Sequence, residues 1–428
     1  MNILIQNGRV LDPANNVDTT CDVLVVAGKV AQVGENLTAE GATVIDATGC
    51  WVTPGLIDMH VHLRSPGQHH KETIATGTAS AALGGFTSIV PMANTSPVVD
   101  NEVVVEFINS RAAKEGYVNV FQVGAITKGM QGQELADIAT MKAAGIVAVS
   151  DDGLPVANPN MLKTAMLYAK QFDLPLLMHS EDHALSAGGV INAGPHADMM
   201  GLKGISADSE EVAVARDIIL AKHTGARLHI QHVSVKESLG HIRAAKAMGL
   251  PVTTEVCPHH FTLIDEDIKT YDANFKMSPP LRSASDREAL IEALRDGTID
   301  AIATDHAPHH ADEKNCEFDL AMNGIVGLET AVPLSISELV NTGVLTPLEL
   351  IAKLSSAPAR ILGLDRGTLG AGVVADITII DPTVQWTIDK DKMATKSKNT
   401  PFHGRAVTGR CRDLIVGGRV VVQNGELC

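Results

Sequence analysis

Short apolar runs alternate with longer amphipathic stretches through the middle of the chain. Apolar runs predict strands near 55–62, 87–93, 118–126, 145–152, 175–181, 227–234, 251–260 and 299–306. Helical patterns follow most of these runs, for example at 71–84, 159–172, 207–223, 235–248 and 284–296. Eight strand–helix units in series predict an α/β fold of the (β/α)8 TIM-like barrel type. A doubly wound open sheet is the alternative, but no G-x-G-x-x-G follows the first strand, so dinucleotide binding has little support.

The two ends of the chain share a different pattern, made of short strands and glycine turns. Such strands are predicted at 3–10 and 22–30 near the start, and at 375–381 and 414–422 near the finish. We therefore expect a small β-sandwich domain built from both termini, residues 1–53 plus 366–428. It would accompany a catalytic barrel of residues 54–365.

Composition narrows the class of protein. The 428 residues suit a barrel of about 250 residues with a second domain. A net charge of -16 argues against a nucleic-acid binder, because phosphate contacts need clustered Lys and Arg. Neither a secretory leader nor an apolar run of membrane-spanning length is apparent. Six scattered cysteines without a C-x-x-C pair indicate reduced thiols and a cytoplasmic location.

The first barrel strand carries the strongest chemical signal. Because side chains alternate along a strand, Asp58, His60, His62 and Arg64 are expected to share one face. Two imidazoles placed two residues apart can bind one divalent metal ion. An arginine next on that face suits an anionic group of a substrate.

Other polar residues fall at the carboxyl ends of later predicted strands. They are Asp151 and Asp152, His179, His232, and Asp305. Each has a plain structural alternative: a hydrogen-bonded core histidine, an Asp-Gly turn or a helix cap. In a β/α barrel these strand ends converge on one mouth. Together with the histidine pair of the first strand, polar residues at five strand ends therefore favour a metal site.

Four histidines and carboxylates suit one or two Zn²⁺ ions. Imidazole and carboxylate oxygen are usual zinc ligands, and a bridging carboxylate could hold two ions about 3.5–4 Å apart. Bound zinc lowers the pKa of water towards about 7, and a further carboxylate could take and return the proton. Cys257, near a histidine pair, is a weaker candidate ligand.

At this point the chain resembles the class I dihydroorotase family of the amidohydrolase superfamily. The matching segments are 58–67 (DMHVHLRSPG), 71–73 (KET), 92–95 (MANT), 150–153 (SDDG), 304–309 (TDHAPH), 324–330 (GIVGLET) and 397–402 (SKNTPF). They run from residue 58 to residue 402. The H-x-H pair alone indicates only the superfamily, whereas the whole set is much more specific.

The resemblance implies a role for each matching residue. The metal-binding positions are His60, His62, Asp152, His179, His232 and Asp305. Asp152 corresponds to a carboxylate that bridges two metals, and Asp305 to the general acid/base. Arg64, Asn94 and His309 correspond to the residues that hold a substrate carboxylate.

The chain departs from the family pattern at two substrate-facing loops. Ser278 stands before Pro-Pro-Leu-Arg where relatives commonly carry Asn, and Met322-Asn323 stand where they commonly carry Pro-Phe. We expect Ser278 to contact substrate and both departures to bear on substrate fit. The polar segment 310–323, directly after His309, is expected to be a mobile loop that orders over substrate.

The implied activity is the reversible conversion of L-dihydroorotate and N-carbamoyl-L-aspartate in pyrimidine biosynthesis. One alternative is a related allantoinase, hydantoinase or dihydropyrimidinase. Another is a catalytically silent homologue that is a structural partner of aspartate transcarbamoylase. Arg64, Asn94 and His309 favour a substrate with a free carboxylate, and the complete ligand set disfavours a silent homologue. The expected partners are a small-molecule substrate, a second copy of the chain in a dimer and, as an open alternative, aspartate transcarbamoylase.

Overall fold

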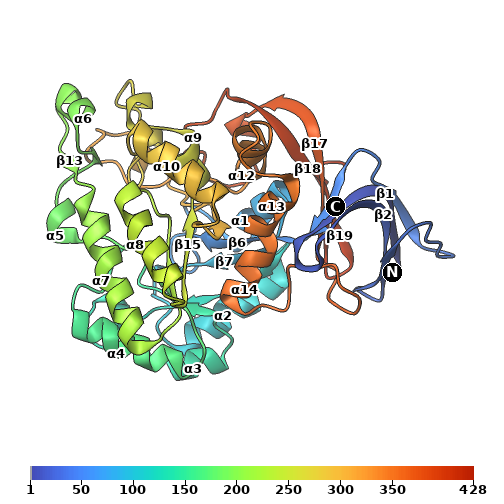
Figure 1. Cartoon of the computed structure of the whole chain (residues 1–428), viewed down its shortest axis with the longest axis horizontal. Helices are drawn as coiled ribbons and strands as arrows, with labels where there is room; N and C mark the ends of the chain where they lie inside the picture. The colour runs from blue at the N-terminus through green and yellow to red at the C-terminus, as the bar shows by residue number, and fades with distance from the viewer. Residues whose placement is uncertain (1) are drawn as a thin grey trace.

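A parallel barrel forms the middle of the molecule, as the computed structural model of residues 2–428 shows (Figure 1). Its strands are β6 (Leu56–Val61), β7 (Phe86–Pro91), β8 (Asn119–Val120), β9 (Val123–Gly124), β10 (Ala148–Val149), β11 (Leu176–Met178), β14 (Leu228–Ile230), β15 (Val252–Val256) and β16 (Ala301–Ile302). Strands β6, β7 and β8 pair in chain order. Strands β9, β10, β11, β14, β15 and β16 also pair in chain order, while β12 and β13 form a separate pair. Together β8 and β9 supply the third barrel position, interrupted at residues 121–122.

The barrel closes where the first strand meets the last. Val61 forms a parallel bridge with His306, and the His62 amide donates to the His306 carbonyl at 2.8 Å. This contact brings the end of β6 beside the end of β16. It therefore places the predicted histidine pair next to the predicted Asp305.

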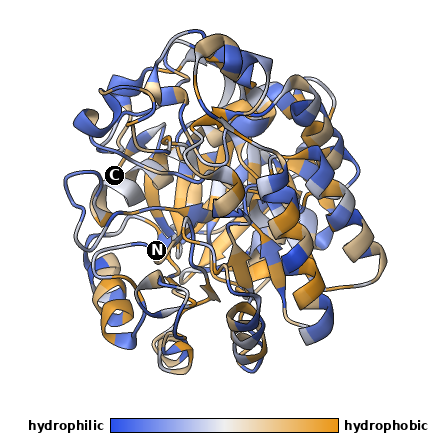
Figure 2. Cartoon of the chain, turned by 90° about the vertical axis from the view of Figure 1, so that its left-hand side faces the viewer, coloured by the Kyte–Doolittle hydropathy of each residue, from blue (hydrophilic) through white to orange (hydrophobic). Residues whose placement is uncertain are grey.

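Helices follow the barrel strands and cover them from outside. They are α1 (Ile74–Gly84), α2 (Glu102–Glu115), α3 (Ile138–Ala143), α4 (Pro159–Lys170), α7 (Asp208–Thr224), α8 (Lys236–Ala247), α10 (Ala284–Arg295), α12 (Ala331–Ser335), α13 (Pro347–Ile351) and α14 (Ala357–Leu362). Side-chain caps at Thr73, Asn101, Asn158 and Ser283 start four of them. The strands at the centre are mainly hydrophobic, while the helices carry hydrophilic positions (Figure 2).

Several predicted strands were longer than the observed ones, and one of them runs into a helix. The expectation of a strand over 251–260 fails after Val256, because α9 (Pro258–Thr262) begins there. Pro258 is the first helical residue, where its fixed φ suits a helix and its missing N–H costs nothing.

A second sheet combines both ends of the chain. Its strands are β1 (Ile3–Asp12), β2 (Val17–Val26), β3 (Lys29–Gly34), β4 (Thr43–Asp46), β5 (Trp51–Pro54), β17 (Ile377–Thr387), β18 (Ala406–Val416), β19 (Arg419–Gln423) and β20 (Glu426–Leu427). Strand β5 pairs with β1 on one side and β17 on the other, which joins the two terminal segments. Figure 1 shows this sheet beside the barrel, with both termini on it. Ile5, Val25, Ile377 and Ile415 belong to a core of its own, which supports our proposal of two domains divided near 54 and 366.

Several short elements lie between the longer helices and strands, in the barrel and in the terminal segments. They are α5 (His183–Ser186), β12 (Ile191–Asn192), α6 (Pro195–Met200), β13 (Gly204–Ile205) and α11 (Ala311–Lys314), with 3-10 turns at Pro13–Asn15, Lys128–Met130, Asp265–Asp267, Ala273–Phe275 and Lys390–Lys392 and π turns at Ile336–Val340 and Ala352–Ser356. The residues of α5 and those before α11 approach the carboxyl ends of the barrel strands. Within residues 2–428, no helix has the length and apolar character needed to cross a membrane.

Candidate metal centre and active site

Six of the predicted residues converge at the carboxyl ends of the barrel strands. His60 lies in β6 and His62 directly after it, and the other four follow β10, β11, β14 and β16: Asp152, His179, His232 and Asp305. All six side chains are buried. Their donor atoms form three overlapping groups, in which every donor lies within 4.8 Å of the others in its group. The structure therefore brings together the whole set that the sequence indicated.

Asp152 lies between two of these groups. Its Oδ1 is 3.4 Å from Nε2 of His60 and 3.7 Å from Nδ1 of His179, while its Oδ2 is 3.4 Å from Nε2 of His62. His232 approaches the same carboxylate at 3.9 Å. The Asp152 carboxylate is thus shared by four histidines, Oδ1 facing three of them and Oδ2 facing His62, as is expected of a carboxylate that bridges two metal ions.

Asp305 approaches from the last strand. Its Oδ1 lies 3.0 Å from Nε2 of His62 and 3.5 Å from Nε2 of His60. Burial favours the neutral acid, but the neighbouring His60 and His62 outweigh it and hold the pKa of Asp305 below its usual value. The Asp305 carboxylate is therefore ionised and faces the centre.

The donor set fits divalent metal ions. Burial disfavours a charged His60, yet Asp305 and Asp152 raise the pKa of His60 well above its usual value. Two buried carboxylates thus make a strongly negative centre that attracts positive charge. Four imidazoles and two carboxylates match the ligand preference of zinc, and two groups sharing Asp152 could hold two ions.

Two further carboxylates bind histidines of the site through the ring nitrogen that faces away from the centre. His60 Nδ1 donates to Glu255 at 2.8 Å, and Glu255 also accepts from His229 Nε2 at 3.1 Å. Burial favours a neutral Glu255, but these two histidines lower its pKa to about 2. His179 Nε2 donates similarly to Glu181 at 2.9 Å. Each bond leaves the other ring nitrogen facing the centre.

Sequence reasoning missed Glu255 and Glu181. Glu255 lies in β15, within the predicted strand 251–260, where only Cys257 had been considered as a ligand, and it is fully buried between Thr254 and Val256. A carboxylate inside a buried strand needs a partner, because an isolated buried charge is costly. That signal was present in the sequence. Its partner His60 was not identifiable, since the two residues are 195 positions apart.

Backbone conformation at the strand ends is unusual at three of these residues. Arg64, His232 and Asp305 have φ values of 55°, 30° and 48°. Non-glycine residues in this region carry strain of order 1–3 kcal/mol each and cluster at functional sites. The strands thus end in turns that direct these side chains into the mouth.

A group of polar residues, here called the anion corner, lies beside the candidate metal ligands. It consists of Arg64, Asn94 and His309. Nη2 of Arg64 donates to Nε2 of His309 at 3.2 Å, and Asn94 Oδ1 accepts from His62 Nδ1 at 2.9 Å. Burial, with Arg64 nearby, lowers the pKa of His309 to about 3, so its ring is neutral. The corner therefore offers one guanidinium charge and neutral polar groups.

One cavity of about 590 Å³ is lined by the anion corner and by five of the six candidate metal ligands, all except His60. Ser278, Met322 and Asn323 also line it, so both departures from the family pattern face the cavity. The volume suits a small-molecule ligand.

The segment 310–323 is tied down at two points. It contains α11, whose buried Lys314 donates to the carbonyls of Met322 and Gly324, and Glu313 pairs with Lys71 at 2.8 Å. Closure of this segment over substrate stays a prediction.

Two other candidates lie outside the ligand groups. Asp151 turns away, and its carboxylate accepts from the amides of Ile126 and Thr127. Cys257 groups with His259 and His260 instead of the six ligands.

Comparison with known proteins identifies the family. A family model described as "Dihydro-orotase-like" matches residues 49–238. Proteins named dihydroorotase from Geotalea daltonii and Geobacter metallireducens are 53% and 54% identical, each over 98% of this chain and 99% of the relative. The chain belongs to the dihydroorotase family. The relative from Pelotomaculum thermopropionicum, 54% identical over 99% of both chains, agrees.

Solved structures similar to this dihydroorotase family member are amidohydrolases. An L-hydantoinase (dihydropyrimidinase) from Arthrobacter aurescens has a TM-score of 0.90 and 27% identity, covering 100% of this chain and 97% of that one. A dihydropyrimidinase from Brevibacillus agri has a TM-score of 0.88 and 27% identity, covering 100% and 96%. These likenesses confirm the predicted barrel with its β-sandwich domain. The chain is a cyclic amidohydrolase.

Proposed function

We propose that this chain catalyses the reversible hydrolysis of L-dihydroorotate to N-carbamoyl-L-aspartate, a cytoplasmic step of de novo pyrimidine biosynthesis. One observation carries the proposal: the anion corner lines the same cavity as five of the six candidate metal ligands. A substrate with both a free carboxylate and a ring amide would engage both groups. The dihydroorotase relatives, at 50–54% identity, support this choice of substrate.

The anion corner would hold the substrate carboxylate. Arg64 is buried, and its guanidinium contacts only His309 and the Pro308 carbonyl among the described side chains and backbone. A buried guanidinium without a paired carboxylate is ready to receive an anion. Asn94 would hold the carboxylate together with Arg64 and His309, and Ser278 would contact the substrate from a neighbouring position in the cavity.

The six converging ligands would bind one or two Zn²⁺ ions, with Asp152 shared between them. When bound, the metal would polarise the amide carbonyl and lower the pKa of water. His60 and His179 would keep their coordinating nitrogens turned inward through Glu255 and Glu181.

Asp305 would move the proton. In hydrolysis the oxygen of water bonds to the amide carbon, the ring carbon–nitrogen bond breaks, and the nitrogen needs a proton. Asp305 is ionised, so it can accept the proton of the attacking water and deliver it to the departing nitrogen. In ring closure the same carboxylate works in the opposite direction.

The alternatives fit the cavity less well. Uncharged dihydropyrimidines would leave Arg64 buried without a counter-charge, which is costly. A silent homologue should have lost ligands, whereas here all six converge. Ring opening of L-dihydroorotate by the purified, zinc-loaded protein tests the proposal, with allantoin as a second substrate. Turnover of allantoin alone would refute it.

We further propose that the chain forms a homodimer, as the family resemblance implies. Sedimentation of the purified protein, alone and with aspartate transcarbamoylase, would test both the dimer and the alternative hetero-complex.

A further inference from the structure

We infer that Asn399 is a positioning residue that fixes the anion corner, an inference that rests on the proposed function. Asn399 lies in the segment 388–405 that connects β17 to β18 of the terminal sheet. It is 90 positions from His309 and is 3% exposed. A connection between two strands of the terminal sheet would thus contribute indirectly to substrate binding in the barrel.

Both the nitrogen and the oxygen of the Asn399 side-chain amide form hydrogen bonds with two segments at the mouth of the barrel. Its Nδ2 donates to the carbonyls of Ala307 and Gly324, both at 3.0 Å. Its Oδ1 accepts from the His309 amide at 3.0 Å, and its own carbonyl accepts from the Val326 amide at 2.9 Å. These four bonds fasten residues 307–309 to residues 324–326.

Arg64 and Asn399 both hold the Pro308–His309 peptide group, Arg64 at its carbonyl and Asn399 at its amide. Nε of Arg64 donates to the Pro308 carbonyl at 3.1 Å, while Asn399 binds the Ala307 carbonyl and the His309 amide. Residues 307–309 are therefore fixed from both sides. Loss of Asn399 would free this backbone, and with it both the His309 ring and the partner of Arg64.

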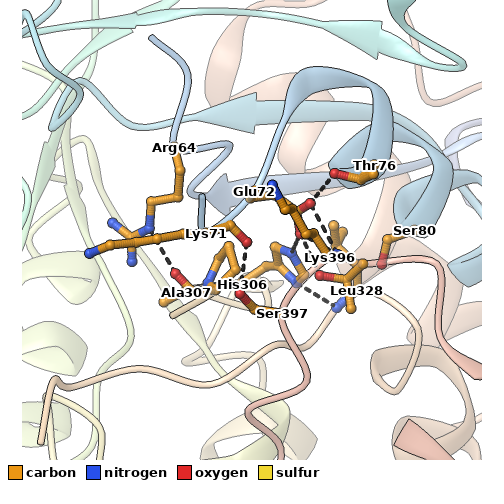
Figure 3. A network of polar contacts seen from close by, with 12 residues as sticks. Arg64, Lys71, Glu72, Thr76, Ser80, His306, Ala307, Leu328, Lys396 and Ser397 are labelled. Carbon is orange, nitrogen blue, oxygen red and sulfur yellow. Dashed lines mark hydrogen bonds and ion pairs between the residues drawn. The ribbon is translucent and has the colours of Figure 1, made fainter. Parts of the chain in front are cut away.

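The segment that carries Asn399 is itself anchored to the barrel. Ser397 Oγ donates to the Lys71 carbonyl at 2.7 Å, and the Lys396 amide donates to Glu72 at 3.2 Å. Figure 3 shows these contacts close to Arg64 and Ala307, with His306 beside Glu72. The backbone of Asn399 is thus held in place without help from its side chain.

Asn399 acts through other residues and does not line the active-site cavity. It lines a neighbouring hollow of about 480 Å³, and His309 separates that hollow from the cavity. Asn399 therefore has no contact with substrate. Loss of the Asn399 side chain should therefore weaken only the binding of the substrate carboxylate. This carboxylate is present in both the substrate and the transition state. Such a loss raises KM and leaves kcat less changed.

The test compares Asn399→Ala with Asn119→Ala in the full-length, zinc-loaded protein. Asn119 also bridges barrel and terminal segment, through the Thr87 carbonyl at 2.9 Å and Asp376 at 3.0 Å, but away from the cavity. We expect Asn399→Ala to raise KM for L-dihydroorotate at least tenfold, with kcat within threefold of wild type. We expect Asn119→Ala to lower the melting temperature without changing KM. An unchanged KM in Asn399→Ala would overturn the inference.

Two further readouts separate positioning from general damage. In Arg64→Met,Asn399→Ala, the loss of kcat/KM should be at least fivefold smaller than the product of the single losses, because both act on one corner. Hydrogen exchange of the His309 amide should accelerate in Asn399→Ala. Losses of kcat/KM that multiply in the double variant, or an unaltered hydrogen-exchange rate of the His309 amide, would contradict the inference. If wild type itself fails to open L-dihydroorotate, the proposed function fails, and the exchange result still decides the role of Asn399.

Discussion

The carboxylate of Glu255 lies 2.8 Å from Nδ1 of His60, and both side chains are completely buried. The contact fixes the proton on Nδ1, so Nε2 of His60 faces Asp152 and Asp305. A residue on the seventh barrel strand thereby sets the orientation of a proposed ligand on the first.

Glu255→Gln should weaken metal binding and activity by about 10–100-fold, as is typical when the partner of a ligand histidine is altered. An amide retains the shape but loses the charge that holds the Nδ1 proton. Metal content after dialysis against a graded chelator checks this. Glu329→Gln is the control, because Glu329 is a partly buried carboxylate that binds the Ala394 amide and Ser80 instead of a histidine. Equal metal retention in both variants would contradict the role of Glu255.

Asp305→Asn should lower kcat by about 10²–10⁴-fold, the usual contribution of a general base, with any loss of metal adding to this. The fold should survive this nearly isosteric change, and circular dichroism, which reports the secondary structure of the barrel, checks this. Metal stoichiometry measured alongside kcat separates the two contributions. A variant that keeps more than a tenth of wild-type activity would refute proton transfer by Asp305.

Activity restored from apo-protein with zinc should be independent of bicarbonate. Many amidohydrolases bridge two metals with a carboxylated lysine, but Asp152 already supplies a carboxylate at the end of β10. No lysine lies between Gly145 and Pro155. Intact-protein mass after reconstitution, with and without bicarbonate, provides the check. The extra mass of one CO₂ on a lysine, or a bicarbonate requirement, would overturn this account.

Much of the site was predictable because barrel topology converts strand ends into neighbours. Period-two alternation located His60 and His62, and the convergence of strand ends added Asp152 and Asp305. Strand alternation alone could not determine the direction of the Arg64 side chain, because β6 ends at Val61 and Arg64 has a left-handed φ of 55°. Its direction comes from that turn and from the Pro308 carbonyl.

The supporting residues could not be placed from the sequence. Glu255 and Asn399 act through contacts with residues 195 and 90 positions away, and no local pattern encodes such pairs. Helix starts were predictable where a cap exists, as at Ser283, while Pro258 cut short the strand expected over 251–260.

Discrimination between L-dihydroorotate and dihydrouracil tests the central claim most directly, because these substrates share a ring amide and differ in the carboxylate. The measurement is the ratio of their kcat/KM values for wild type and Arg64→Met. We predict a strong wild-type preference for L-dihydroorotate. In Arg64→Met the preference should fall by about 2–5 kcal/mol, the usual cost of removing one partner of a buried charge pair. A wild-type enzyme that prefers dihydrouracil, or a ratio that Arg64→Met leaves unchanged, would contradict the account.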